Sequence, residues 1–415
     1  MAGPLIVFED DLFRDLFPLT LTRPASDLLC GTMTLEEKLR AGLGGPGTVI
    51  HARDYLDLDD RCRAASYAEL FRNHDVLTFV NGRLVFRDGA FEAIDPGWVG
   101  KYVSGTTVVV ANLPKDRIAS LDRCLGAPLD PGVFEGLPAR AIEACLVRYP
   151  WDLINLNGEE IANDFRRLGG SGIELDPPPG VILANEAEIR IAKDAVLSPG
   201  VVVDASKGPV NIAGGAAVMA NASLAGPLHV GPGSIVKMGA RIYGGTSLGP
   251  ISRVGGEIAE SVIQGYSNKQ HDGFLGHSYL GQWVNIGAGT ETSDMKNNYS
   301  TVKVSIGSES VDSGQVFAGL FMGDHSKSGI GTTFNTGTVV GACCNVYGAG
   351  YPPKYIPSFT WGGAPGFVEH RLEAALATAR RAMERRGKAL GPRSEAALRK
   401  VFTLTRTDRT AFLGK

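Results

Sequence analysis

The chain has 415 residues, of which 44% are hydrophobic and 20% charged, with a formal net charge of -3. This length predicts two to three domains of ordinary globular composition. A net charge this small leaves no basic surplus to neutralise phosphates, so no nucleic-acid partner is expected. The six cysteines form no CxxC pair, which excludes the usual zinc sites and a disulfide framework.

The first residues, MAGPLIVFEDDLF, contain no basic segment and become acidic at once. We therefore expect no signal peptide. No apolar run approaches the length of a membrane span, so no membrane association is expected either. These features predict a cytoplasmic enzyme or scaffold.

Strand-like and helical patterns alternate over residues 1 to about 170. The strand-like runs are PLIVFED, GTVIHA, DVLTFVNGRLVF and TTVVVAN, and the helical ones are TLEEKLRAGL, SYAELFRN and DRIASLDRCL. Thr34 is the expected N-cap of the first helix, with Glu37 completing a capping box. The alternation predicts an α/β domain with a mainly parallel sheet covered on both faces.

A linker helix, WDLINLNGEEIANDFRRLG, leaves this domain, and the stiff segment DPPPG follows it. We therefore predict an α/β domain over residues 1–175, a second domain over 176–362 and a helical tail over 363–415.

Beyond residue 176 the hydrophobic period changes to six. Eight successive positions are aliphatic: Ile212, Val218, Leu224, Val230, Val236, Ile242, Leu248 and Val254. A step of six matches neither the helical period nor strand alternation, and it is typical of a parallel β-helix built from hexapeptide repeats. A glycine-rich β-sandwich is the alternative, which eight hits on one phase disfavour.

The same step recurs in three shorter sets: Ile191, Leu197 and Val203; Phe274, Leu280 and Ile286; Phe334, Val340 and Val346. Residues 291–315 break the pattern and predict an inserted loop or hairpin on one face of the solenoid, often the binding face. Residues 366–390 read as a helix with an apolar stripe: Val368, Leu372, Ala375, Leu376, Ala379 and Met383. Its arginines indicate a solvated face, or else a surface for an acidic partner or membrane.

At this point the sequence resembles a known family. VNIGAGTETSD (residues 284–294), preceded by HDGFLGHSYLG (271–281), resembles the acetyltransferase half of the GlmU-like bifunctional enzymes that form UDP-N-acetylglucosamine. GDHSKSGIG (323–331) is similar to a segment of archaeal sugar-1-phosphate nucleotidyltransferases with an acetyltransferase tail, and the longer run is most similar to a bacterial branch of sugar nucleotidyltransferases. The resemblance implies a left-handed β-helix and a homotrimer with acyl-donor sites between neighbouring helices.

Two histidines compete for the role of catalytic base. In the family, this histidine precedes the asparagine of VNIGAG by fourteen residues; His271 has that spacing from Asn285, whereas His277 is only eight residues away. A sugar amine must lose a proton to attack acetyl-CoA, and an imidazole with a pKa near 6.5 can accept it. The resemblance therefore favours His271, and His277 is interpreted as structural or at most a substrate contact.

The resemblance also assigns the remaining site residues. These are Asn285 (orienting the base or substrate), Ala288 and Lys327 (acyl donor), and Arg241, Phe274 and Lys269 (acceptor sugar phosphate). Arginine suits bidentate phosphate binding, although Arg241 could equally be an exposed arginine on a solenoid wall. The family has a lysine where this chain has Ala259, so Lys269 or Lys327 is a candidate to replace its charge.

The first domain resembles a nucleotidyltransferase through PLTLTRPASDLLCGTMTLEEKL. The phosphate-cradling GxGTR loop is replaced by EDDLFRDLF, the family lysine aligns with Ala25, and the metal-binding aspartate is Arg83. Arg14, Arg23 and Arg83 could still bind an anion, so Arg23 and Arg83 are the predicted nucleotide contacts. No metal ligand is predicted, and Mg²⁺ is expected only if this domain is active.

These observations predict a GlmU-like enzyme that N-acetylates an amino-sugar 1-phosphate with acetyl-CoA in nucleotide-sugar biosynthesis. The alternatives are a sugar-1-phosphate nucleotidyltransferase using UTP or dTTP at a remodelled phosphate site, and a non-catalytic trimeric sugar- or nucleotide-binding scaffold.

Overall fold

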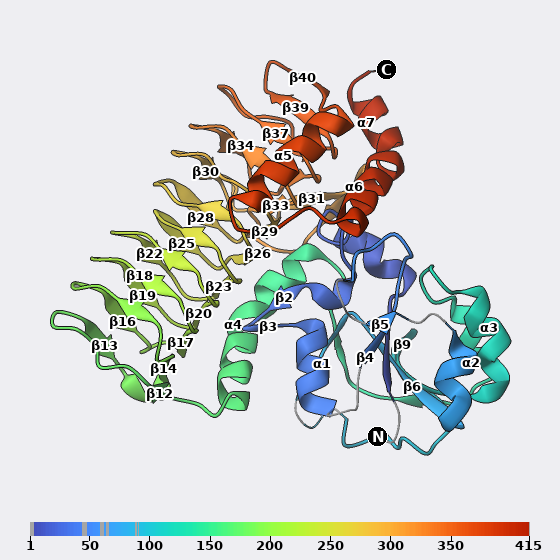
Figure 1. Ribbon diagram of the computed structural model, residues 1–415. Helices are drawn as coiled ribbons and strands as arrows, with labels where there is room; N and C mark the ends of the chain where they lie inside the picture. Colours follow the sequence, from blue (N-terminus) through green and yellow to red (C-terminus); the bar gives the residue numbers. More distant parts are fainter. Residues whose placement is uncertain are drawn as a thin grey trace. The chain divides into compact units, whose positions relative to one another are not determined.

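The computed structural model describes residues 4–43, 48–58, 62–63, 66–87, 89 and 91–414 (Figure 1). The chain forms two compact units. The first consists of Met1–Leu16, Thr22–Leu28 and Met33–Arg148, and the second of Phe17–Leu21, Leu29–Thr32 and Tyr149–Lys415. No helix among the described residues is both long and apolar enough to cross a lipid bilayer.

The first unit is built on a seven-stranded sheet with the order β10-β8-β9-β6-β1-β4-β5. Its strands are β1 (Leu5–Phe8), β4 (Thr48–His51), β5 (Cys62–Arg63), β6 (Val76–Asn81), β8 (Gly100–Ser104), β9 (Thr107–Pro114) and β10 (Ala139–Ala141). Strand β1 pairs in parallel with β4 and β6, whereas β9 runs antiparallel to β6 and β8. This confirms a mainly parallel α/β domain.

Both faces of this sheet are buried, as expected for parallel strands. Alternate residues of β1 enter different apolar clusters: Ile6 and Phe8 face one side, and Leu5 and Val7 the other. The helices are α1 (Leu35–Leu43), α2 (Tyr67–Leu70) and α3 (Ile118–Arg123). The predicted capping box at α1 is confirmed, because Thr34 and Glu37 exchange hydrogen bonds between side chain and backbone.

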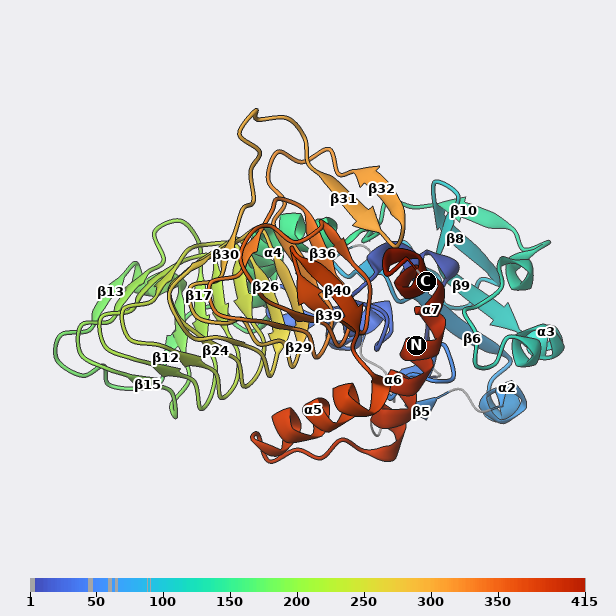
Figure 2. The same cartoon turned by 90° about the horizontal axis from the view of Figure 1, so that it is seen from above.

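The second unit begins with α4 (Pro150–Arg167) and continues as a parallel β-helix with three walls (Figures 1 and 2). The first wall contains β12 (Gly172–Ile173), β14 (Ile189–Ile191), β17 (Val210–Ile212), β20 (Leu228–Val230), β23 (Thr246–Leu248), β26 (Val262–Gly265), β29 (Tyr279–Gln282), β33 (Leu320–Met322), β36 (Thr338–Val340) and β38 (Tyr355–Ile356). Helix α4 covers this wall, where the Asn157 amide donates to the Gly245 carbonyl at 2.8 Å.

The other two walls follow the first within each coil. The second wall contains β13 (Ile182–Ala184), β16 (Val202–Asp204), β19 (Ser223–Ala225), β22 (Arg241–Ile242), β25 (Glu257–Ala259) and β28 (Phe274–Gly276), continued by β30 (Glu291–Thr292) and β35 (Thr333–Phe334). The third contains β15 (Val196–Leu197), β18 (Ala217–Val218), β21 (Ile235–Val236), β24 (Arg253–Val254) and β27 (Asn268–Lys269), continued by β34 (Lys327–Ser328), β37 (Asn345–Val346) and β39 (Thr360–Gly363). Each coil therefore passes from the first wall to the third and then to the second.

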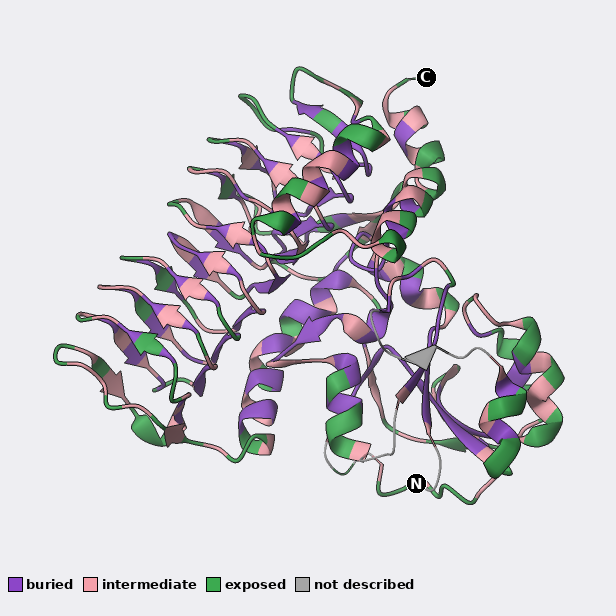
Figure 3. Ribbon diagram, viewed as in Figure 1, coloured by how far each residue is buried: buried purple, intermediate pink, exposed green. Residues whose placement is uncertain are grey.

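The six-residue period correctly predicts the solenoid core. All eight aliphatic positions from Ile212 to Val254 belong to one buried cluster inside the coils (Figure 3). Phe274 is an exception, because it points outward and Leu275 takes its core position. The step between paired core residues falls from 18 (Leu224 to Ile242) to 16 and 17 at Ile258 and Leu275, which shifts the phase.

The predicted insertion is confirmed as a hairpin of β31 (Lys303–Ile306) and β32 (Glu309–Asp312), which projects from the coils in Figure 2. The chain ends in α5 (Leu372–Glu384), α6 (Pro392–Leu404) and α7 (Arg406–Phe412). The prediction of a helix from residue 366 is wrong at its start. Residues Gly366–Glu369 form β40, antiparallel to β39, and Val368 is 60% exposed. Ala364 and Pro365 make the turn between these strands, and the helix begins only at Leu372.

Candidate functional site

A row of polar side chains runs up the outside of the third wall. Arg253, Asn268, Asn285 and Lys327 occupy matching positions in successive coils. Side chains alternate along a strand, so the residues that follow them face inward, as Val254 and Ile286 do in the core. The Asn268 amide donates to the Asn285 side-chain oxygen at 3.2 Å, which links two members of the row.

His271 lies at the corner that follows this row, where the chain turns from the third wall to the second. Its side chain is exposed. Ala288 lies at the same corner one coil further on, and the Gly289 N–H donates to the Asp272 carbonyl at 3.0 Å. The structure thus brings together His271, Asn285 and Ala288, which the sequence resemblance selected, on two neighbouring coils.

Lys269 lies two residues before His271 in the same coil, and its side chain points into the interior of the coil. It is 2% exposed, and its ammonium donates to the carbonyls of Gly255 (3.0 Å) and His271 (2.8 Å). Burial lowers the pKa of Lys269 to about 8, against the opposing charges of Glu291 and Asp272. These contacts fix the backbone that carries His271, while the predicted role of Lys269 in substrate binding stays a prediction.

The second wall carries the two other residues predicted to bind the acceptor. Arg241 pairs in register with Glu257, and Glu257 with Phe274, so the three form a row on the outside of the wall. The Arg241 guanidinium lies 3.3 Å from the Glu257 carboxylate. A sugar phosphate at Arg241 would therefore have to compete with an exposed protein carboxylate.

Lys327 is turned away from Ala288. Its ammonium donates to the carbonyls of Trp283 (3.4 Å) and His325 (3.2 Å), at the corner between the first and third walls. Burial lowers the pKa of Lys327. Ala288 occupies the corner on the other side of the same wall, so the structure does not gather these two predicted acyl-donor contacts.

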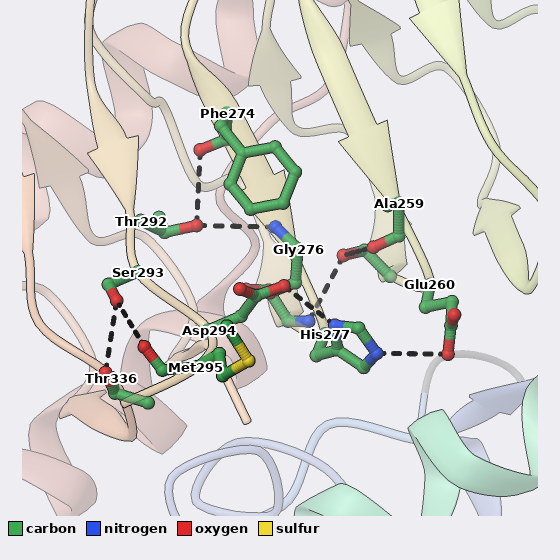
Figure 4. Close-up of polar contacts among 12 residues, drawn as sticks. Ala259, Glu260, Phe274, Gly276, His277, Thr292, Ser293, Asp294, Met295 and Thr336 are labelled. Atoms are coloured by element: carbon green, nitrogen blue, oxygen red, sulfur yellow. Dashed lines mark hydrogen bonds and ion pairs between the residues drawn. The ribbon is translucent and has the colours of Figure 1, made fainter. Parts of the chain in front are cut away.

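His277 is held between two carboxylates (Figure 4). Its Nδ1 lies 2.8 Å from Asp294 and its Nε2 3.1 Å from Glu260, and its ring stacks on Phe317 at 4.8 Å. Burial lowers the pKa of His277, but the hydrogen bonds and charges of the two carboxylates prevail and raise it to about 9. An imidazole that is already protonated near neutral pH cannot accept a proton from a substrate.

The same cluster supports the base of the β31–β32 hairpin. The Gly319 N–H donates to the His277 carbonyl, and the Ala318 N–H to the Asp294 carbonyl, both at 2.8 Å. These contacts support the structural role predicted for His277.

In the first unit, two arginines lie at the carboxyl ends of the central strands, each paired with a carboxylate after β1. Arg53 contacts Glu9 through Nε (2.8 Å) and Nη2 (2.9 Å), and Arg83 contacts Asp10 at 2.8 and 2.6 Å. Arg83 also donates to the Val147 carbonyl and is 2% exposed.

Arg23, the second predicted nucleotide contact, is 7% exposed, and its carbonyl accepts a hydrogen bond from Arg53. The predicted nucleotide contacts are therefore buried, and Arg83 is occupied by protein groups. Within the described ranges, no three His, Cys, Asp or Glu side chains gather as a metal site would require.

Comparisons with known proteins agree with the resemblance to the GlmU-like family. Residues 5–171 match a family described as sugar nucleotidyl transferase. A bifunctional sugar-1-phosphate nucleotidylyltransferase/acetyltransferase of Sulfurisphaera tokodaii is 34% identical over 91 residues, which are 22% of this chain and 23% of the relative. The bifunctional protein GlmU of Methanocaldococcus jannaschii is 35% identical over 88 residues, 21% of each chain.

These matches confirm the resemblance to the GlmU-like bifunctional family, although they span less than a quarter of either curated relative. Among solved structures, an Arabidopsis UDP-N-acetylglucosamine acyltransferase covers 58% of this chain and 95% of its own, at 14% identity and a TM-score of 0.26. A TM-score this low supports no conclusion about the fold, which rests on the structure of the chain itself.

Two contacts near the site escape prediction from the sequence. Asn268 lies 17 residues before Asn285, whereas a regular coil has 18 residues. A search of the sequence at steps of 18 residues would therefore miss Asn268. Arg386 donates to Asn268 at 2.7 Å from a position 118 residues further along the chain. No local sequence pattern could have revealed that contact.

Proposed function

We propose that the second unit transfers the acetyl group of acetyl-CoA to the amine of an amino-sugar 1-phosphate, as a step of nucleotide-sugar biosynthesis in the cytoplasm. His271 is the general base, Asn285 orients the base or the substrate, and Ala288 offers its backbone to the acyl donor. The observation that carries this proposal is the exposed His271 beside Asn285 and Ala288 on a hexapeptide-repeat solenoid.

In this reaction the amine nitrogen attacks the thioester carbonyl and forms a carbon–nitrogen bond. His271 accepts the proton that the amine loses, and the carbon–sulfur bond then breaks. The imidazolium returns the proton to the departing thiolate, so the base is regenerated. The high pKa of His277 supports the choice of His271, because only a neutral imidazole can take the proton.

A homotrimer is part of the proposal. Met238 (64% exposed) and Ile330 (81% exposed) lie at the same corner as His271, in coils before and after it. Large contiguous apolar patches mark surfaces that another chain covers, and these two exposed side chains on one corner support such a surface here. In a trimer the neighbouring subunit would pack against this corner and close one side of the acyl-donor site.

Nucleotidyl transfer by the first unit, joining a sugar 1-phosphate to UTP or dTTP, is the second candidate, because residues 5–171 match the nucleotidyl transferase family. The residues present do not fit the Mg²⁺ that such a reaction needs. The family's metal-binding aspartate is replaced by Arg83, which engages both oxygens of Asp10. Pyrophosphate release from nucleotide and sugar 1-phosphate would support this candidate, and its absence would count against it.

The decisive experiment compares His271→Ala with the unmodified protein in acetyl-CoA consumption over a panel of hexosamine phosphates. Loss of a general base lowers turnover by roughly 10²–10⁴-fold, and affinity for acetyl-CoA should change little. His74→Ala, in the first unit, is the matched control and should retain full turnover. Unchanged turnover in His271→Ala would discard the assignment.

A further inference from the structure

The C-terminal helix α5 returns along the side of the solenoid toward the candidate site (Figure 2). Just after the end of this helix, the Arg386 Nη2 donates to the Asn268 side-chain oxygen at 2.7 Å. Asn268 donates in turn to Asn285 at 3.2 Å. A hydrogen-bonded chain therefore joins the tail to the asparagine beside His271.

The backbone at Arg386 is held by the helix end. Its N–H donates to the Met383 carbonyl at 2.8 Å, and the Lys388 N–H donates to the same carbonyl at 3.1 Å. Gly387, between them, has a φ of +66°, the left-handed conformation that ends many helices. Met383 itself is buried, which anchors this turn. Arg386 is thus presented from a fixed turn.

Arg253 lies beside Asn268 on the solenoid. It is the neighbour of Asn268 in the coil below, paired with it in register, so both side chains project from the outer face of the third wall. Burial lowers the pKa of Arg386, and the positive charges of Arg253 and Arg385 lower it further. No carboxylate is among these influences.

The Arg386 Nε–H is buried and has no hydrogen-bond acceptor among the described residues. A buried donor of this kind costs free energy unless a ligand or water satisfies it. Within the described part of the chain, neither Arg253 nor Arg386 forms an ion pair, and Arg386 keeps an unused donor. Together they provide what a phosphate group needs: charge and several N–H groups in a planar fork.

We infer that Arg253 and Arg386, which both neighbour Asn268, form a phosphate-binding subsite beside Asn285. The inference deepens the proposed acetyl transfer and rests on it for the identity of the ligand. Both substrates of that reaction carry phosphate: the acyl donor in its nucleotide part, and the acceptor on its sugar. The C-terminal tail is then a structural part of the binding site.

The test uses Arg386→Gln and Arg253→Gln in the full-length chain, with Arg385→Gln as control. Arg385 is the exposed neighbour of Arg386, so this control removes an equal charge at the same helix end. Calorimetric titration with inorganic pyrophosphate, acetyl-CoA and glucosamine 1-phosphate in turn measures each affinity. Loss of a charged hydrogen bond should weaken pyrophosphate binding roughly ten- to a hundredfold in the two test variants, and less than about threefold in the control.

The two substrates separate the possible sources of the phosphate. A loss confined to acetyl-CoA assigns the subsite to the donor, and one confined to glucosamine 1-phosphate assigns it to the acceptor. The inference is overturned if both test variants bind all three probes as the unmodified protein does, or if the unmodified protein binds none. Binding needs no turnover, so a chain that binds these probes through both arginines but fails to transfer acetyl would refute the proposed function and leave the subsite standing.

Thermal unfolding of each variant provides the control for folding. If Arg386 served only to latch the tail, Arg386→Gln would lower the midpoint without changing the affinity for pyrophosphate, which contradicts the inference. A phosphate subsite predicts the additional result that pyrophosphate raises the midpoint of the unmodified protein and of Arg385→Gln, but not that of Arg386→Gln.

Discussion

A pair of arginines lies at the strand ends of the first unit, and another lies at the third wall of the second unit. The two pairs differ in whether a carboxylate of the protein neutralises the positive charge. Arg53 and Arg83 each donate two hydrogen bonds, from Nε and Nη2, to a carboxylate of the same chain. Arg386 donates to the neutral Asn268, which pairs in register with Arg253, and among the described residues neither arginine forms an ion pair with a carboxylate. An arginine whose charge and N–H donors already bind a carboxylate binds a phosphate weakly. A pair of arginines without a neighbouring carboxylate attracts a phosphate.

This difference bears on the proposed function, because residues 5–171 match a sugar nucleotidyl transferase family whereas acetyl transfer is proposed for the solenoid. The carboxyl ends of parallel strands are where such folds bind ligands. Here these ends are filled by Glu9, Asp10 and their arginine partners. The arginine charges at these strand ends form ion pairs inside the first unit, whereas exposed polar side chains lie at the solenoid corner.

Breaking one internal pair should have the largest effect on stability. In Arg53→Met, the Glu9 carboxylate, 2% exposed, loses its counter-charge, which costs about 3–5 kcal/mol in the free energy of unfolding. Methionine retains apolar contact with the Phe13 ring, over which the guanidinium lies at 3.9 Å. The comparison variant Arg14→Met removes an exposed pair with Asp11 and should cost under about 0.5 kcal/mol in urea unfolding.

The pH dependence of this loss has a definite sign. Burial raises the pKa of Glu9 above its ordinary 4.5, against the lowering effect of Arg53. Without Arg53 the pKa should rise further, so the folded chain binds this proton more tightly than the unfolded chain. The loss of stability in Arg53→Met should therefore be smaller in acid, where Glu9 is protonated in both proteins, and grow as the pH rises through the raised pKa of Glu9. Equal deficits at pH 5 and pH 8 would contradict this account.

The cluster around His277 offers a second, smaller test, because its charges are also satisfied within the protein. The pKa of His277 is about 9 in the folded chain, against an ordinary 6.5. The cluster therefore stabilises the fold fully below pH 6.5, and this contribution is lost as the pH rises through about 9. A shift of this size corresponds to roughly 3 kcal/mol, which screening at the half-exposed Glu260 should reduce to about 1–2 kcal/mol.

The variant that tests this is His277→Asn, since the backbone here has a φ of +43° and asparagine tolerates positive φ. Unfolding free energies from pH 6 to pH 10 should fall for the unmodified protein and stay nearly level for the variant. Parallel curves for the two proteins would show that His277 carries no charge-dependent stability.

The core of the solenoid was predictable from the sequence because inward positions must be apolar and recur at a fixed step. The prediction failed at Phe274, where shortened coils shift the step and Leu275 turns inward. The exposure of His271 agrees with its predicted role, but the inward direction of Lys269 follows from its place one residue after Asn268 in a strand whose phase had shifted. Contacts such as Arg386 with Asn268 depend on how the tail packs, and no periodicity encodes that.

Lys269→Met separates support of the corner from contact with substrate. Methionine fills a similar volume but cannot donate to the carbonyls of Gly255 and His271, so the corner should loosen. We expect kcat to fall about 3–10-fold, the effect of losing hydrogen bonds of about 1 kcal/mol, with KM for the amino sugar unchanged. An exposed lysine on an earlier coil, Lys193, provides the control as Lys193→Met. A raised KM with constant kcat would instead place Lys269 in contact with the acceptor.

The smallest effect is expected from Phe274→Tyr, which adds one hydroxyl group to the outward-facing ring. The ring points outward beside Glu257, so a hydroxyl added there reaches solvent and should change stability by less than about 0.5 kcal/mol. If the ring edge faces the bound sugar, the hydroxyl can form one hydrogen bond and lower KM for the acceptor about threefold. Phe317→Tyr adds the same group beside His277, on the opposite edge of the second wall, and should leave KM unaltered. Equal KM values for Phe274→Tyr and the unmodified protein would remove Phe274 from the acceptor site, and the second wall would then contribute only Arg241 to it.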